Sequence, residues 1–177
     1  RRDELVLKRL RTGEVRDAEL VASMALPGVA ITVGVVALAV PITYAAGFEL
    51  PRNPLLLLVA VLVACVTFAA LAIWTASWTR TAESAQLTSG PVMLLALAGS
   101  FTAGLPESVT RVTDLLPGAA INDLLMVAWF GREPDELDRV GWLQGFVEAG
   151  PGFAVLVAWA VLALVLATRS LRWEPRT

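Results

Sequence analysis

Four stretches of this chain contain no charged side chain, and they run for 29, 27, 23 and 20 residues. An α-helix rises about 1.5 Å per residue, so about 20 apolar residues cross a hydrocarbon core of about 30 Å. Each stretch is therefore long enough to cross a bilayer. We predict membrane spans at residues 20–48, 54–79, 84–106 and 149–168.

The remaining composition agrees with a membrane protein, because 56% of the residues are hydrophobic and only 17% are charged. Inside lipid, a helix satisfies its own backbone hydrogen bonds. The predicted fold class is therefore all-α: a polytopic helical membrane protein with four transmembrane helices, a cytoplasmic amphipathic helix, and outer interfacial or re-entrant helices.

The distribution of cations predicts the orientation, since Lys and Arg accumulate on cytoplasmic loops. Six of the 14 cations precede the first span, and with that end inside, ten lie on the cytoplasmic side. Both ends of the chain are then predicted to be cytoplasmic. Lys8 is the only lysine, and the abundance of Arg, Ala and Val indicates a GC-rich bacterial genome. We interpret the chain as a multi-pass protein of a bacterial plasma membrane.

The long outer connection, residues 107–148, contains a further helix pattern in "LLPGAAINDLLMVAWFG", residues 115–131. Leu116, Ala120, Leu124 and Val127 share one helical face, and Gly131 is suited to end the helix. The segment is too short and too polar to cross a bilayer. We expect it to lie in the interface or to dip into the membrane and return.

Catalytic and cofactor chemistry has no counterpart in these residues. Histidine is absent, Cys65 is the single cysteine, and no Gly-rich loop ends in Gly-Lys-Ser/Thr. We therefore predict no catalytic site, no cofactor and no metal. No predicted span carries an Asp, Glu, Lys or Arg, whereas ion-coupled carriers usually need an ionisable group there. Any uphill work must draw on energy from elsewhere.

Polar side chains within the spans are mainly hydroxyls, which we expect to bond carbonyls of the preceding turn or a neighbouring helix. These residues are Thr32, Thr43, Tyr44, Thr67, Thr75, Ser77, Thr88, Ser89, Ser100 and Thr102, with Gln86 near a span end. Small residues four apart can let helices approach closely. Such pairs are Ala30/Gly34, Ala60/Ala64, Ala72/Ala76 and Gly99/Ala103. Trp159 lies in mid-span and is interpreted as a packing residue.

The chain opens with an amphipathic stretch in which Leu5, Leu7 and Leu10 alternate with Lys8, Arg9 and Arg11. Thr12 and Gly13 are suited to stop this helix, and Asp17 to cap the first span. Taken alone, these cations could serve only to set the topology and to bind anionic lipid headgroups.

This opening, "LVLKRLRTGEVRDAELVAS" followed by a span, resembles the cytoplasmic segment between the second and third membrane helices of ABC transporter permeases of the type-2 exporter class. "LPGAAINDLLMVAW" resembles the outer re-entrant helices of that family, and "LATRSLRWEPR" its cytoplasmic C-terminus. The resemblance implies that residues 1–177 are spans three to six of one transmembrane domain. The family's elbow helix and first two spans have no counterpart here, and the start at Arg1 fits a fragment.

The resemblance further implies that residues 1–17 hold a cytoplasmic coupling segment, whose part 4–17 docks onto a separate ATP-binding cassette ATPase subunit. The implied coupling residues are Leu5, Leu7, Lys8, Arg9, Leu10, Arg11, Gly13, Arg16 and Asp17. The expected function is a permease subunit of an ATP-driven exporter for an amphipathic or lipid-like substrate or drug. Its expected partners are the ATPase, a second permease copy and membrane lipid, with no nucleic acid. The alternative is a non-transporting membrane scaffold that recruits a cytoplasmic partner.

Overall fold

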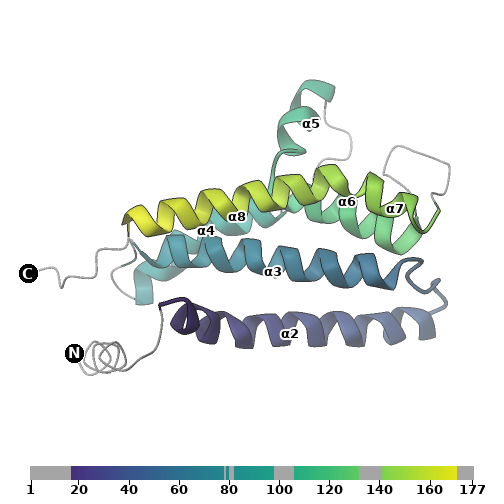
Figure 1. The fold of residues 1–177 in the computed structure, drawn as a ribbon, viewed down its shortest axis with the longest axis horizontal. Coiled ribbons are helices and arrows are strands. Elements are labelled where there is room, and N and C mark those ends of the chain that lie inside the picture. Colours follow the sequence, from purple (N-terminus) through teal and green to yellow (C-terminus); the bar gives the residue numbers. More distant parts are fainter. Residues whose placement is uncertain (1–16, 78, 80–81, 98–105, 132–140, 171–177) are drawn as a thin grey trace, which may run out of the picture.

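The computed structural model describes residues 17–77, 79, 82–97, 106–131 and 141–170, and within these ranges it contains helices and no strand (Figure 1). The helices are α2 (Asp17–Ala45), α3 (Pro54–Ala76), α4 (Ala82–Leu97), α5 (Glu107–Thr113), α6 (Pro117–Phe130), α7 (Gln144–Glu148) and α8 (Gly150–Ser170). The predicted all-α fold class is confirmed.

Among the described residues, three segments are long and apolar enough to cross a membrane, and they lie in α2, α3 and α8. The fourth predicted span, 84–106, corresponds to α4, whose apolar part Ser84–Leu97 is too short to qualify within the described residues. Residues 98–105 lie outside the described part of the chain. A polytopic helical membrane protein is thus confirmed, and the count of four spans stays a prediction.

Helices α3 and α8 form the centre of the bundle and lie side by side along most of their length (Figure 1). Toward the cytoplasmic ends predicted for both helices, Ala70 and Leu71 of α3 pack against Ala163 of α8. The small side chains of α8 allow this close approach, because Ala160, Ala163 and Ala167 recur on one helical face and are buried.

The small-residue pairs predicted from sequence contribute less to packing than this alanine face of α8. Ala60 is buried and Ala64 half-buried on the packed side of α3. Ala30 is exposed, and a Cβ built on Gly34 would have no neighbour within 4 Å. Ala72 and Ala76 are also exposed, whereas Gly99 and Ala103 lie outside the described residues. Among the pairs that the structure describes, only Ala60/Ala64 therefore lies against another helix.

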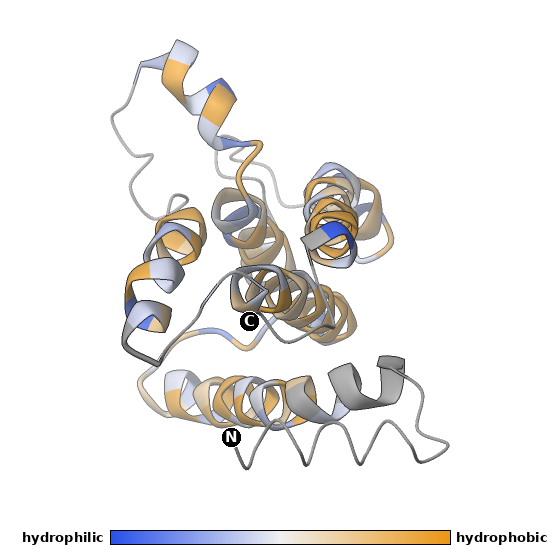
Figure 2. Cartoon of the chain, turned by 90° about the vertical axis from the view of Figure 1, so that its left-hand side faces the viewer, coloured by the Kyte–Doolittle hydropathy of each residue, from blue (hydrophilic) through white to orange (hydrophobic). Residues whose placement is uncertain are grey.

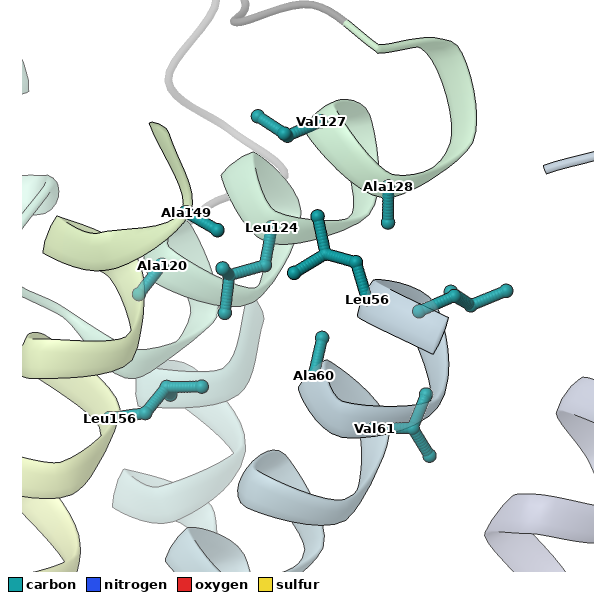
Figure 3. Packing of buried hydrophobic residues seen from close by; sticks show 10 residues of the cluster. Leu56, Ala60, Val61, Ala120, Leu124, Val127, Ala128, Ala149 and Leu156 are labelled. Carbon is teal, nitrogen blue, oxygen red and sulfur yellow. The ribbon is translucent and has the colours of Figure 1, made fainter. Parts of the chain in front are cut away.

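At the opposite end, α6 fills the space between α3 and α8. Leu56 of α3, Leu124 of α6 and Leu156 of α8 are each almost fully buried and form the centre of one apolar cluster (Figure 3). Burying a Leu side chain contributes about 1.5 to 3 kcal/mol relative to leaving it exposed. This cluster therefore supplies most of the apolar packing that positions α6.

Helix α2 lies beside α3 and is packed much less closely than the other long helices (Figure 1). None of its most apolar 18-residue window is buried, against 33% for α3. Apolar residues cover the exposed sides of α2, among them Leu26, Ile31 and Leu38 (Figure 2). A helix that is hydrophobic on all sides is suited to contact lipid or other membrane helices.

Candidate functional site

The predicted coupling residues lie almost entirely outside the part of the chain that the structure describes. This applies to Leu5, Leu7, Lys8, Arg9, Leu10, Arg11, Gly13 and Arg16. Asp17, the last of the set, is the first residue of α2. The geometry that can be described is therefore that of the opposite end of the bundle, where α6 and α7 surround the start of α3.

Helix α6 ends where its sequence predicts and begins at Pro117, so Leu116, which was expected on its apolar face, lies just before it. Leu116 precedes it in an extended conformation, and Pro117 occupies the first turn, where a missing backbone N–H costs nothing. At its other end Gly131 adopts φ 66°, ψ 37°, and its N–H donates to the Val127 carbonyl. This left-handed conformation favours glycine, so the predicted glycine stop is confirmed.

The predicted apolar face of α6 is the one that packs. Ala120, Leu124 and Val127 are buried, while Asn122 is exposed. Gly152 on α8 permits the contact, because a Cβ there would lie only 3.0 Å from Cγ of Leu124. Helix α6 thus lies beside the first turns of α3 and α8 and not across their ends. Its interfacial or re-entrant placement in the membrane stays a prediction.

The start of α6 touches the end of α4. A Cβ built on Gly118 would lie 2.6 Å from the Leu95 carbonyl oxygen and would also overlap the Ala96 carbonyl. Only glycine allows the two backbones to approach this closely. Helices α4 and α6 therefore follow one another along the bundle, α4 toward the end of α3 and α6 toward its beginning (Figure 1).

The start of α6, called its inner end below, is linked to α8 by a hydrogen bond from Trp159. Its indole Nε1 donates a 2.8 Å hydrogen bond to the Leu115 carbonyl oxygen, just before α6 begins. The ring is half-buried and packs beside Ala70, Leu71 and Ala163. Trp159 is therefore a packing residue, as its sequence position indicated, with an additional polar contact to the outer connection.

The outer end of α6 is tied to the residues that precede α3. The backbone N–H groups of Arg52 and Asn53 donate to the carbonyls of Trp129 and Ala128, at 3.2 and 3.0 Å. The Trp129 indole donates to the Glu49 carbonyl at 3.1 Å. The first two bonds satisfy carbonyls in the last turn of α6, which have no partner within the helix.

The Asn53 side chain connects the start of α3 to the turn before α7, and it was not identified from the sequence. Its Oδ1 accepts from the Leu56 backbone N–H at 3.0 Å and caps α3, while its Nδ2 donates to the Trp142 carbonyl at 3.1 Å. The residue is only 4% exposed. The Asn-Pro pair before an apolar run is the signal that could have predicted the cap. The bond to Trp142 had no such signal, because 89 residues separate the partners.

Hydroxyls in the helices bond backbone carbonyls, as expected. Thr32 donates to Gly28 within α2, and Thr67 donates to Val63 at 2.9 Å and to Leu156 of α8 at 3.1 Å. Thr67 is fully buried, so it is a contact between helices and not part of an open path. Further hydroxyls with carbonyl partners in the preceding turn are Thr43, Thr75, Ser77, Thr88 and Ser89. Ser100 and Thr102 lie outside the described residues.

The described residues hold no group of three or more His, Cys, Asp or Glu side chains arranged for a metal ion. Cys65 is a free, half-buried thiol on α3. The arrangement is one of apolar packing with a few polar hydrogen bonds between segments.

Comparison with known proteins identifies a family. The sequence profile of the ABC-2 family transporter proteins matches residues 8–169. No curated protein and no solved structure matches the chain.

Proposed function

Because this chain belongs to the ABC-2 family of transporter proteins, which are membrane components of ABC-type transport systems and not themselves catalytic, we propose that it is the permease subunit of an ATP-driven exporter. The observation that carries the proposal is the family match, which extends from the basic opening segment to the end of the last long helix.

The proposed energy source is a separate ATP-binding cassette subunit that docks on residues 4–17. Leu5, Leu7 and Leu10 would form the apolar docking face, and Lys8, Arg9 and Arg11 would pair with acids of the ATPase. Support comes from chain continuity, since α2 begins at Asp17, the last residue of this segment. Gly13, Arg16 and Asp17 would then transmit force from the ATPase into α2.

The proposed substrate is amphipathic or lipid-like, or a drug of that character. The candidate spans of α2, α3 and α8 carry no charged residue except Arg169, the last residue of the α8 span. The hydroxyls described above already have carbonyl partners. A surface of this kind offers little to replace the hydration shell of an ion.

The proposed assembly contains two ATPase subunits and a second permease, either another copy of this chain or a related one. It would lie in a bacterial plasma membrane with both ends of this chain in the cytoplasm. Closure of the ATPases on ATP would push residues 4–17 and tilt α2 and then α3, which it contacts. The path would then open beside the outer helices α5, α6 and α7.

The experiment reverses two charges in the docking segment of the complete transporter, co-expressed with ATP-binding cassette subunits from the same genome. The double variant Lys8→Glu/Arg9→Glu is expected to lose most ATPase recruitment and export. The matched control Arg1→Glu/Arg2→Glu makes the same change in charge outside residues 4–17 and should retain both activities. Normal recruitment and export by the first variant would contradict the proposed docking.

A further inference from the structure

We propose that Asn53 is a positioning residue whose side-chain amide holds the outer helices closed over the start of α3. The inference rests on the proposed function, because it assigns a closed position to the outer end of an exporter. It concerns a contact between side chain and backbone that can be measured without knowing the substrate.

Asn53 has two roles that use different atoms. Its Oδ1 caps α3 by accepting from Leu56 N–H at 3.0 Å. Its Nδ2 reaches across to the Trp142 carbonyl at 3.1 Å, in the turn that leads into α7. A substitution that keeps an acceptor and removes the donor therefore separates the cap from the bridge.

The bridge lies in a well-packed position. A Cβ built on Gly145, in the first turn of α7, would lie 3.7 Å from Asn53 Nδ2 and equally close to Val127 of α6. Asn53 is itself 4% exposed, so water has little access to replace a lost partner. A buried donor or acceptor that loses its partner costs its full desolvation free energy. This single hydrogen bond can therefore hold the turn before α7 against the start of α3.

The other contacts of α6 determine how its outer end would open. Trp159 holds the chain before α6 through Leu115, and Gly118 lies against the end of α4. At the other end of α6, the backbone N–H of Asn53 donates a hydrogen bond to the Ala128 carbonyl. Loss of the amide bridge releases the segment 141–149 first and weakens the outer end of α6, while the inner end stays fixed. The outer end then swings open about the Leu115–Gly118 segment.

The test compares three variants of the complete transporter in lipid nanodiscs at pH 8, using hydrogen exchange followed by mass spectrometry. Asn53→Asp and Asn53→Ser both retain an oxygen that can cap α3, and both lack the amide donor. Asn53→Ala lacks the cap as well. The serine variant is uncharged, so a result common to Asp and Ser cannot come from burying a carboxylate.

All three variants are expected to exchange about fivefold faster than the unmodified protein over residues 141–149, the effect of losing one hydrogen bond from the closed state. Faster exchange at the first turn of α3, residues 54–58, is expected in Asn53→Ala alone. Exchange over 141–149 that stays unchanged in both Asn53→Asp and Asn53→Ser would overturn the proposal.

A second measurement distinguishes positioning from general stability. In the assembled transporter, Asn53→Ser is expected to hydrolyse more ATP per substrate exported, because the outer end no longer closes reliably between cycles. A purely structural residue would lower hydrolysis and export together, and that result would also overturn the proposal. If the unmodified protein neither recruits an ATPase nor exports, the proposed function fails, while the exchange result still decides the role of the bridge.

Discussion

The indole nitrogen of Trp159, in the middle of α8, donates a 2.8 Å hydrogen bond to the carbonyl oxygen of Leu115, which lies 44 residues earlier and just before α6. This bond joins the last long helix to the connection that carries the outer helices. It makes the position of α6 depend on α8 at one end and on the start of α3 at the other.

Replacing Trp159 by Phe keeps an aromatic ring and removes the donor. We expect the free energy of unfolding to fall by about 1 kcal/mol, since the Leu115 carbonyl loses its partner. The rate of hydrogen exchange over residues 117–121 should rise by about fivefold, the factor that corresponds to this free energy. The measurement is thermal or denaturant unfolding in lipid, paired with exchange.

The control for this change is Trp142→Phe, because Trp142 is 52% exposed and its ring contacts Phe146 edge-on at 5.8 Å between centroids. A Phe there can keep that ring contact, so we expect less than about 0.5 kcal/mol of change. Equal effects at the two positions would show that the Leu115 bond adds nothing beyond ring packing.

Replacing Gly118 by Ala should displace α6 from α4. A Cβ at this position would overlap the Leu95 and Ala96 carbonyls, and backbone atoms cannot rotate away as a side chain can. We expect a loss of about 1 to 3 kcal/mol in the free energy of unfolding, typical of overpacking.

The matched control is Gly90→Ala within α4, where the added Cβ would have no neighbour within 4 Å. Alanine is favoured over glycine in a helix by about 1 kcal/mol, so this variant should be as stable as the original or more so. Similar stability of the Gly118 and Gly90 variants would contradict the close approach of α6 and α4.

Replacing Thr67 by Val removes a hydroxyl without changing the shape of the side chain. Thr67 is fully buried and reaches the Leu156 carbonyl of α8, so we expect a loss of about 0.6 kcal/mol, the average for such bonds between membrane helices. Thr32→Val serves as the comparison, since that hydroxyl is exposed and bonds Gly28 of its own helix. A larger loss at Thr32 than at Thr67 would show that the contact between α3 and α8 is not the stabilising one.

Much of the architecture could be predicted from residue type and order. Uncharged runs predicted α2, α3 and α8, and Gly131 predicted the end of α6. These features are local, because helix length, capping and burial in lipid depend on neighbouring residues or on the bilayer. The spacing of Ala160, Ala163 and Ala167 was also present in the sequence and was not used, although these residues form the face of α8 that lies in the bundle.

The sequence by itself therefore determined that this protein is a helical membrane protein. Uncharged runs of 20 or more residues favour burial in lipid, where a helix satisfies its own backbone hydrogen bonds. The tertiary structure alone decided that α6 enters between α3 and α8, that Gly118 lies against the end of α4, and that Asn53 bridges to Trp142. Each of these contacts joins residues far apart in the chain, and no local pattern records which distant partner will lie within hydrogen-bonding or packing distance.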